Sequence, residues 1–127
     1  MLSVQELTNS GLVLKSEKIK RAVLTALADS EMVKILDAAM HQSKSVIQIV
    51  RETGVSHSTA YRKIKWLIEE KLLIVDKIDI TEESKKSSFF RTILKSFNVK
   101  YEYNNVAIEA EQNVDTLRKI TEKFFSL

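Results

Sequence analysis

Four consecutive segments between residues 17 and 71 repeat their apolar residues with the period of an α-helix. The first, residues 17–28, is predicted to be a short helix, although a strand is an alternative for so apolar a stretch. Its apolar face consists of Ile19, Val23, Ala26 and Leu27. In the second, the N-cap residues Asp29 and Ser30 precede four apolar residues at i, i+3, i+4 and i+7, which predicts an amphipathic helix. These four residues are Met32, Ile35, Leu36 and Ala39.

The third and fourth segments have clear helix-boundary signals. Ser45 and Gln48 have the spacing of a capping box, and Gly54 stands where a helix C-terminus needs a left-handed residue. Ser56 can cap the fourth helix, which is expected to end near Glu70. The faces predicted to be buried are Val46, Ile49 and Val50 in the third segment and Ala60, Ile64, Leu67 and Ile68 in the fourth.

After residue 71 the apolar period changes to two, which is typical of strands. The alternating residues are Leu72, Ile74, Ile78 and Ile80, with Asp76 as an interruption. Residues 81–88 are polar and are predicted to form a flexible tip between two strands. The return segment carries Ile93, Phe97, Val99, Tyr101 and Tyr103 on one face.

A second hairpin is predicted around Asn104 and Asn105, because asparagine tolerates the positive φ of a two-residue turn. Folding there places Tyr103 opposite Val106, Tyr101 opposite Ile108 and Val99 opposite Ala110, all on one face. On the other face Lys100 would lie opposite Glu109. The hairpin could complete a sheet, help dimerisation or form a ligand pocket with Phe97 and Tyr101.

The two ends of the chain differ in pattern. Residues 1–16 show no sustained period and are predicted to form a flexible N-terminal arm. From residue 113 onwards the apolar spacing is that of a helical a/d seam, which predicts a terminal helix. Its stripe, proposed for dimerisation, is Leu117, Ile120, Phe124 and Leu127. The alternative is that this stripe covers the core of its own monomer.

Composition excludes several classes of site. The 127 residues contain no cysteine, no proline, two glycines and two histidines. Disulfides, thiolate metal sites and glycine-rich phosphate loops are therefore excluded, and a histidine-built catalytic or metal centre has little material. No segment is as long and apolar as a membrane span, and the first residues do not resemble a signal peptide. We therefore expect a cytoplasmic binding protein with no catalytic residues, no metal and no cofactor.

Positive charge is concentrated in the middle of the chain. The net charge is +3, and between residues 42 and 68 five basic residues stand against one acid, Glu52. The part from Glu102 to the end is mildly acidic. This distribution indicates a polyanionic partner for the central segment.

The third and fourth segments have the spacing of a helix-turn-helix. A small or aliphatic residue stands four positions before the turn glycine, which lets two helices cross closely. Apolar residues stand six and ten positions after the glycine and would bury the second helix. The four positions are Val50, Gly54, Ala60 and Ile64.

Residues 29–95, about half of the chain, resemble the winged helix-turn-helix domain of ArsR-like archaeal and bacterial transcriptional regulators. The residues that carry the resemblance are Ile49-Val50, Thr53-Gly54-Val55-Ser56, Ser58-Thr59-Ala60-Tyr61-Arg62-Lys63-Ile64, Leu67 and Lys71-Leu72-Leu73. The resemblance implies a DNA-binding regulator that acts as a homodimer on pseudo-palindromic operators. The metal-sensing ligands of the family have no counterpart here, since cysteine is absent and His41 and His57 are far apart. A small-molecule effector also has no supporting motif.

Together these patterns predict an α+β, mostly helical fold: a winged helix-turn-helix with a β-hairpin wing, an additional C-terminal β-hairpin and a terminal helix. The expected divisions are an arm over residues 1–16, the DNA-binding domain over 17–95 and a dimerisation extension over 96–127. The extension is expected to belong to the same compact unit as the DNA-binding domain.

The candidate DNA-binding residues lie on the outward face of the helix that starts at Ser56, with additions from the preceding helix and the wing. They are Ser45, His57, Ser58, Thr59, Tyr61, Arg62, Lys63, Lys65, Lys85 and Lys86. Arg62 can contact guanine O6 and N7 with two hydrogen bonds, and Ser45 starts a helix whose N–H groups can hold a phosphate. The alternative for each basic residue is a solvated surface role. His57 is also suited to a polar turn and Trp66 to packing.

The function predicted from the sequence is a sequence-specific DNA-binding transcriptional regulator, a homodimeric repressor that reads the major groove of double-stranded DNA. The alternatives are a winged-helix protein-interaction module of a transcription or chromosome-associated complex, and a non-specific architectural DNA-binding protein.

Overall fold

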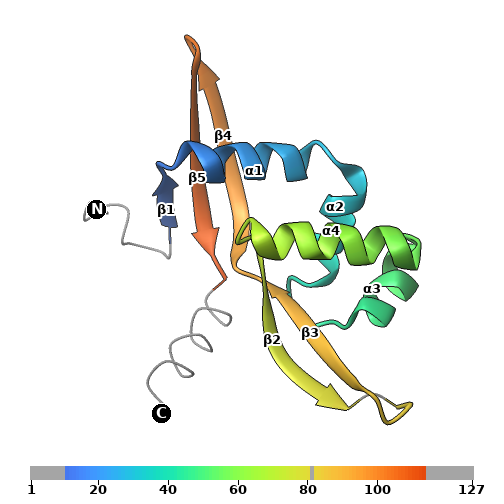
Figure 1. Ribbon diagram of the computed structural model, residues 1–127. Helices are drawn as coiled ribbons and strands as arrows, with labels where there is room; N and C mark the ends of the chain where they lie inside the picture. Colours follow the sequence, from blue (N-terminus) through green and yellow to red (C-terminus); the bar gives the residue numbers. More distant parts are fainter. Residues whose placement is uncertain (1–10, 81, 114–127) are drawn as a thin grey trace, which may run out of the picture.

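The computed structural model describes residues 11–80 and 82–113, which form four helices and five strands (Figure 1). In chain order the elements are β1 (Gly11–Leu14), α1 (Glu17–Leu27), α2 (Ser30–Ala38), α3 (Val46–Thr53), α4 (His57–Glu69), β2 (Leu73–Ile80), β3 (Lys86–Thr92), β4 (Leu94–Glu102) and β5 (Asn105–Gln112). The predicted α+β fold with a wing and a second hairpin is confirmed. None of the helices described in these ranges is long and apolar enough to cross a membrane.

The helix boundaries follow the local signals. The Asp29 carboxylate accepts hydrogen bonds from the backbone N–H groups of Glu31 and Met32 and caps α2. Ser45 and Gln48 form the predicted capping box at α3. Gly54 ends α3 with a φ of 75°, a left-handed conformation that glycine adopts without strain.

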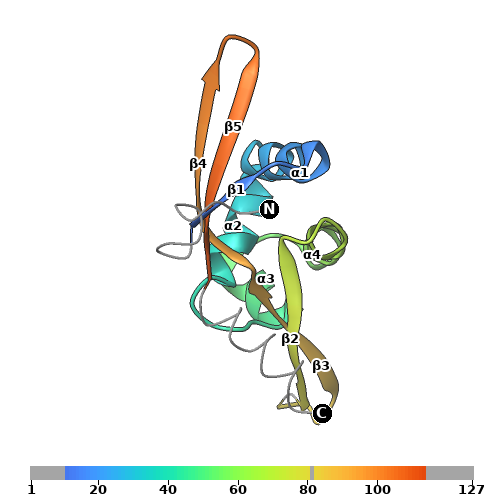
Figure 2. The same cartoon turned by 90° about the vertical axis from the view of Figure 1, so that its left-hand side faces the viewer.

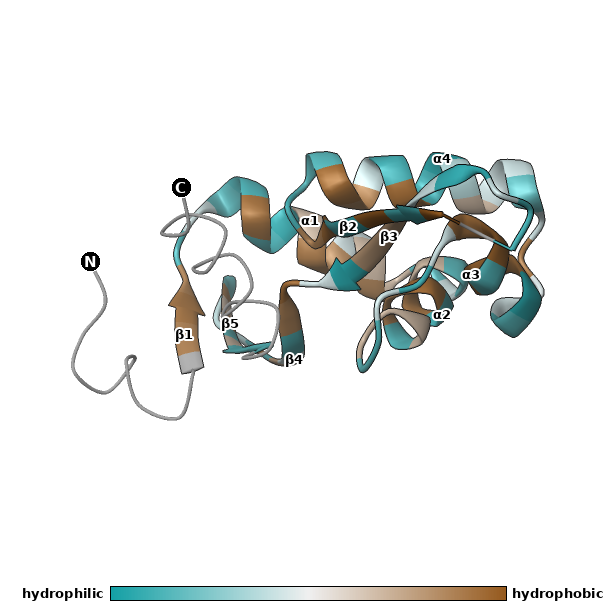
Figure 3. Ribbon diagram, turned by 90° about the horizontal axis from the view of Figure 1, so that it is seen from below, coloured by the Kyte–Doolittle hydropathy of each residue, from teal (hydrophilic) through white to brown (hydrophobic). Residues whose placement is uncertain are grey.

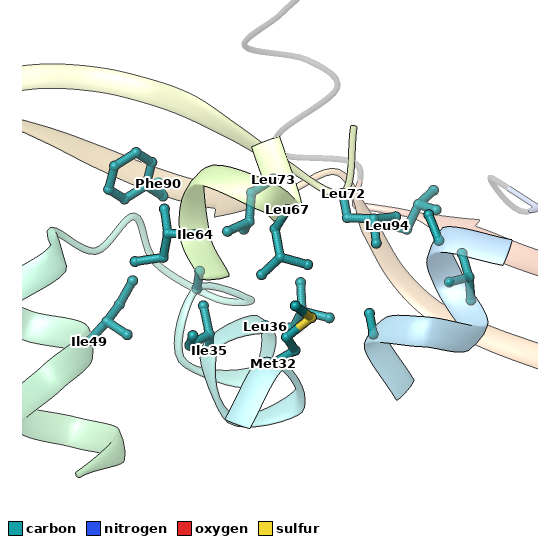
Figure 4. Packing of buried hydrophobic residues seen from close by; sticks show 14 of the residues in the cluster. Met32, Ile35, Leu36, Ile49, Ile64, Leu67, Leu72, Leu73, Phe90 and Leu94 are labelled. Atoms are coloured by element: carbon teal, nitrogen blue, oxygen red, sulfur yellow. The ribbon is translucent and has the colours of Figure 1, made fainter. Parts of the chain in front are cut away.

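The helices and strands share one hydrophobic core. Ile35, Ile49, Ile64 and Leu67 point toward one another between α2, α3 and α4 (Figure 4). Leu14, Ile108 and Ala110 of the β1, β5 and β4 sheet belong to the same cluster. Apolar and polar bands alternate along α1 and α4, as expected of helices with one buried face (Figure 3).

Two antiparallel sheets flank the helices. The strands β2 and β3 form a two-stranded wing, and the second sheet has the order β1-β5-β4. Lys44 pairs with Phe90 through two backbone hydrogen bonds of 3.0 and 2.8 Å, which attaches the wing to the chain just before α3. The order α2, Lys44 bridge, α3, α4, β2, β3 is that of a winged helix-turn-helix.

The start of the chain differs from the predicted flexible arm. Residues 11–14 form β1, which pairs with β5 from Gly11 opposite Glu111 to Leu14 opposite Ile108. Leu14 is buried in the core. A segment of four residues is too short to show a period, and its partner strand lies almost a hundred residues later. The apolar pattern therefore did not predict β1. Residues 1–10 lie outside the described residues.

The predicted division at residue 95 falls inside β4. This strand begins at Leu94, which is itself buried in the core, so the wing and the second sheet are joined by a short bend at Ile93. The predicted terminal helix, with Leu117, Ile120, Phe124 and Leu127, lies outside the described residues.

The second hairpin turns one residue earlier than predicted, which shifts the pairing of its strands by two residues. Tyr103 and Asn104 occupy the turn, with positive φ values of 49° and 61°, and Glu102 pairs with Asn105. As a result Tyr101 lies opposite Val106, not opposite Ile108. A shift of two residues keeps every side chain on the same face, so the apolar pattern fits both registers equally well. The tertiary contacts at the base of the hairpin decide between them.

The alternation along β2 is broken by a bulge. The register of β2 against β3 shifts between Val75 and Lys77, and Asp76 turns inward to 2% exposure. The Ser43 hydroxyl donates a hydrogen bond to Asp76 there. Beyond the bulge Ile78 and Ile80 are each 66% exposed, so the alternating apolar residues of this strand do not form one continuous buried face.

Candidate nucleic-acid interface

The core sets the orientation of α4. Ala60, Ile64 and Leu67 are buried, with at most 2% exposure. The opposite side of the helix therefore faces solvent from the first turn onwards. The predicted site residues that are exposed there are His57, Ser58, Tyr61, Arg62 and Lys65, and Thr59 is half-buried.

Lys63 does not belong to this outward face. It is 8% exposed, and its ammonium group forms an ion pair with Asp29 at the start of α2. Glu31 lies 3.4 Å from the same nitrogen. The prediction that Lys63 lies on the outward face of α4 is therefore wrong. The sequence around Lys63 shows its charge but does not show that two acidic residues of another helix pair with it.

The Lys63–Asp29 pair also changes the titration of both groups. The hydrogen bond from Lys63 lowers the pKa of Asp29, and the backbone N–H of Met32 lowers it further. The hydrogen bond to Asp29 raises the pKa of Lys63. The Asp29 carboxylate thus caps α2 and also binds Lys63 of α4. This shared contact fixes the start of α2 against α4.

Ser45 serves the fold of α3. Its hydroxyl accepts a hydrogen bond of 3.2 Å from the Gln48 N–H, and its own N–H donates to the Gln48 side chain at 2.9 Å. The residue is 3% exposed. The Ser45 side chain therefore holds the first turn of α3 in place instead of offering a hydroxyl to a ligand.

Ser56 is the N-cap residue of α4, but its side chain makes no capping hydrogen bond. The turn between α3 and α4 is instead stabilised by Thr53, the last residue of α3. The Thr53 hydroxyl donates to the Ile49 carbonyl at 2.6 Å and accepts from the Val55 N–H at 3.2 Å. Buried Val55 then anchors the turn in the core.

The wing presents basic residues near its tip. Lys85 and Lys86 are exposed, as predicted. Lys77, on the neighbouring strand, lies over the ring of Phe89 at 5.1 Å from the ring centroid. The strand β3 begins at Lys86, so the tip is shorter than the predicted segment 81–88.

The elements that carry these residues lie at one end of the molecule. Figure 1 shows α3, the adjoining end of α4 and the tip of the wing on the right, whereas the β4–β5 hairpin projects at the top left. The exposed face of α4 and the wing tip can therefore approach the same partner. The hairpin points away from it (Figure 2).

Phe97 and Tyr101, which were considered as the lining of a ligand pocket, have different surroundings. Phe97 packs against the core, and Tyr101 is 68% exposed. A pocket of about 210 Å³ lies elsewhere, where the end of α2 meets β3, β4 and β5. It is lined by Met40, His41, Arg91, Lys95, Glu111, Gln112 and Asn113. In the part of the chain described, no group of three or more histidine or carboxylate side chains is arranged to hold a metal ion.

Comparison with known proteins gives a distant structural likeness only. No protein-family model matches the chain, and no curated protein sequence matches it. The crystal structure of NolR from Sinorhizobium fredii is similar with a TM-score of 0.41 and 17% identity, over 88% of this chain and 94% of NolR. The structure of GAS PerR-Zn-Zn is similar with a TM-score of 0.46 and 12% identity, over 91% of this chain and 82% of that one.

Proposed function

We propose that this protein is a sequence-specific transcriptional regulator that binds double-stranded DNA as a homodimer and acts as a repressor in the cytoplasm. The observation that carries the proposal is the outward face of α4, where Tyr61, Arg62 and Lys65 are exposed while the opposite face is locked into the core. The wing supplies Lys85 and Lys86 at the same end of the molecule.

In this proposal α4 enters the major groove with its first turns foremost. Arg62 reads a guanine through O6 and N7, because the guanidinium fork matches that pair of acceptors. Ser58, Thr59 and Tyr61 contact phosphates or base edges, and His57 lies at the helix start beside them. Lys65, Lys85 and Lys86 bind phosphates, which adds affinity without adding sequence information.

A homodimer would place two copies of α4 about one DNA turn apart and so read an inverted repeat. The stripe Leu117, Ile120, Phe124 and Leu127 is proposed as part of the dimer contact, with coverage of its own core as the competing role. Deletion of residues 114–127, which keeps Asn113, tests this, because an unchanged dimer in light scattering would remove the stripe from the interface.

The first experiment is selection from a randomised pool of duplex DNA, followed by a salt titration of binding to the enriched sequence. We expect an inverted repeat and a steep loss of affinity with salt. Salt-dependent binding without enrichment would point to an architectural DNA-binding protein. Absence of binding at low salt would contradict DNA binding and favour a protein-interaction module.

Two variants then locate the interface. Arg62→Ala should weaken binding to the enriched sequence by about 1–3 kcal/mol and relax one base position, whereas Lys85→Ala should weaken binding to all sequences alike. Lys95→Ala is the matched control, because it removes an exposed lysine from the start of β4, outside α4, the wing tip and the projecting end of the hairpin. Equal effects of all three substitutions would contradict the proposed orientation on DNA.

A further inference from the structure

Five large apolar side chains are exposed on α1 and on the free end of the β4–β5 hairpin. Their exposed fractions are 37% for Leu24, 41% for Leu27, 40% for Val99, 68% for Tyr101 and 91% for Tyr103. We refer to these five residues as the α1–hairpin patch. None of them belongs to the outward face of α4 or to the wing.

Lys20 shows that the two parts of the patch adjoin. Lys20, Leu24 and Leu27 are spaced by four and three residues, so they follow one stripe of α1. The ammonium group of Lys20 donates a hydrogen bond of 2.9 Å to the Val106 carbonyl of β5. Val106 lies opposite Tyr101 in the hairpin. The stripe that contains Leu24 and Leu27 therefore faces the side on which the hairpin continues past α1.

Within the described residues, no third strand pairs with the end of the hairpin. The short strand β1 pairs with β5 only from Ile108 to Glu111. Beyond that point the hairpin is a two-stranded ribbon that projects past α1 (Figures 1 and 2). A two-stranded ribbon is marginal in water unless something packs on its apolar face. On the projecting part, that face carries Val99 and Tyr101.

We propose that a second copy of this chain covers the patch, so that the hairpin of each copy lies across α1 of the other. Such a contact is symmetric, because each copy contributes the same helix and the same hairpin. The charges allow it: α1 is basic, with Lys18, Lys20 and Arg21 against Glu17. The projecting part of the hairpin is neutral, because Lys100 forms an ion pair with Glu102, so the contact does not bring two basic surfaces together.

The size of the patch also fits a pair of copies. The exposed parts of its five side chains amount to on the order of 500 Å² per copy, judged from the usual areas of leucine, valine and tyrosine. A standard interface buries about 800 Å² per partner, and the aliphatic stems of the basic residues along α1 would supply the remainder.

The arrangement leaves the candidate DNA interface open, because the hairpin and the wing tip point to different ends of the molecule. The role of this dimer in DNA binding rests on the proposed function, because each of the two joined copies would present its own α4 to the DNA. Self-association can nevertheless be measured without DNA.

The absence of cysteine allows a direct test by cross-linking. The variants Leu24→Cys and Tyr103→Cys are mixed and treated with a short bismaleimide. We expect a cross-linked pair that contains one copy of each variant. The matched control replaces Tyr103→Cys with Ile78→Cys, because Ile78 is 66% exposed on the wing. A cross-link of equal yield in the control, or none with Tyr103→Cys, would overturn the proposal.

A second measurement uses the full chain in sedimentation equilibrium. The double variant Tyr101→Ser, Tyr103→Ser should raise the dissociation constant of the dimer at least tenfold, with an unchanged circular dichroism spectrum. Tyr61→Ser, which removes a 60% exposed tyrosine from α4, should leave it unchanged. A monomeric wild type, or an unchanged dimer in the double variant, would contradict the proposal.

Binding to a single DNA half-site separates this inference from the proposed function. The double variant should bind one half-site with wild-type affinity, because its α4 and wing are intact. A wild type that forms the patch-dependent dimer but binds no DNA would remove the proposed function and leave the dimer contact standing.

Discussion

Arg62 and Lys63 are adjacent basic residues on α4 with opposite environments. One helical step turns the side chain by about 100°, which takes Lys63 from the solvent face to the edge of the core. Arg62 is exposed, whereas Lys63 meets Asp29 at the N-terminus of α2. The sequence shows the charge of both residues, but only the packing of α2 against α4 assigns their roles.

Replacement of Lys63 by methionine tests this assignment. Lys63→Met should lower the free energy of unfolding by about 1–2 kcal/mol at neutral pH, because Asp29 loses its partner in a partly buried position. Lys65→Met is the control, since Lys65 is exposed on the same helix. Urea unfolding followed by circular dichroism measures both, and equal losses would contradict a specific role for Lys63.

The same pair predicts a dependence on pH. The pKa of Asp29 is lowered in the folded state, so its contribution is complete above its unfolded pKa of about 4. This contribution is lost as pH falls through the lower folded pKa. The pKa of Lys63 is raised, so its contribution persists below about pH 10.5 and is lost as pH rises further. The stability difference between wild type and Lys63→Met should therefore be constant near neutrality and shrink at pH 3.

At the scale of single elements, the two N-cap serines provide a matched pair. Ser45 makes both hydrogen bonds of a capping box, whereas Ser56 makes no side-chain capping bond. Ser45→Ala should cost about 1–2 kcal/mol of unfolding free energy, and Ser56→Ala only a few tenths. Thermal unfolding of the two variants measures the difference. A larger loss for Ser56→Ala would show that its hydroxyl caps α4 in solution.

The helices and the hairpins differ in how far their sequences determine them. The start of α3, its glycine end and the buried face of α4 depend on residues within a few positions of one another, and all were predicted. The β4–β5 register depends on contacts across the sheet, and the observed pairing differs by two residues from the predicted one. In β2 the bulge at Asp76 is held by Ser43, more than thirty residues away, so alternation failed there.

At the scale of the whole molecule, Asn113 joins the helical part to the second sheet. Its backbone N–H donates to the Ile93 carbonyl at 2.8 Å. Its side-chain amide donates to the Met40 carbonyl at 3.0 Å and to the Thr92 hydroxyl at 3.2 Å. One residue at the end of β5 thus contacts the end of α2 and the bend between β3 and β4.

Asn113→Ala should therefore destabilise the whole fold by about 1–3 kcal/mol, because it leaves buried acceptors without their donor. Asn98→Ala, on the exposed face of β4, should change stability by less than about 0.5 kcal/mol. Urea unfolding should stay a single transition in both variants, since one core includes both sheets. Separate unfolding of the second sheet would show that the two parts are independent.

The sequence by itself determined the four helices, their caps, the helix-turn-helix spacing and the presence of two hairpins. These features depend on dihedral preferences, local hydrogen bonds and the period of apolar residues, all of which act over a few neighbouring positions. Tertiary structure decided the inclusion of β1 in the sheet, the register of β4 against β5, the bulge at Asp76 and the inward position of Lys63. Each of these features depends on contacts with residues distant in the sequence. Such contacts do not change the local pattern of apolar residues, so the pattern cannot predict them.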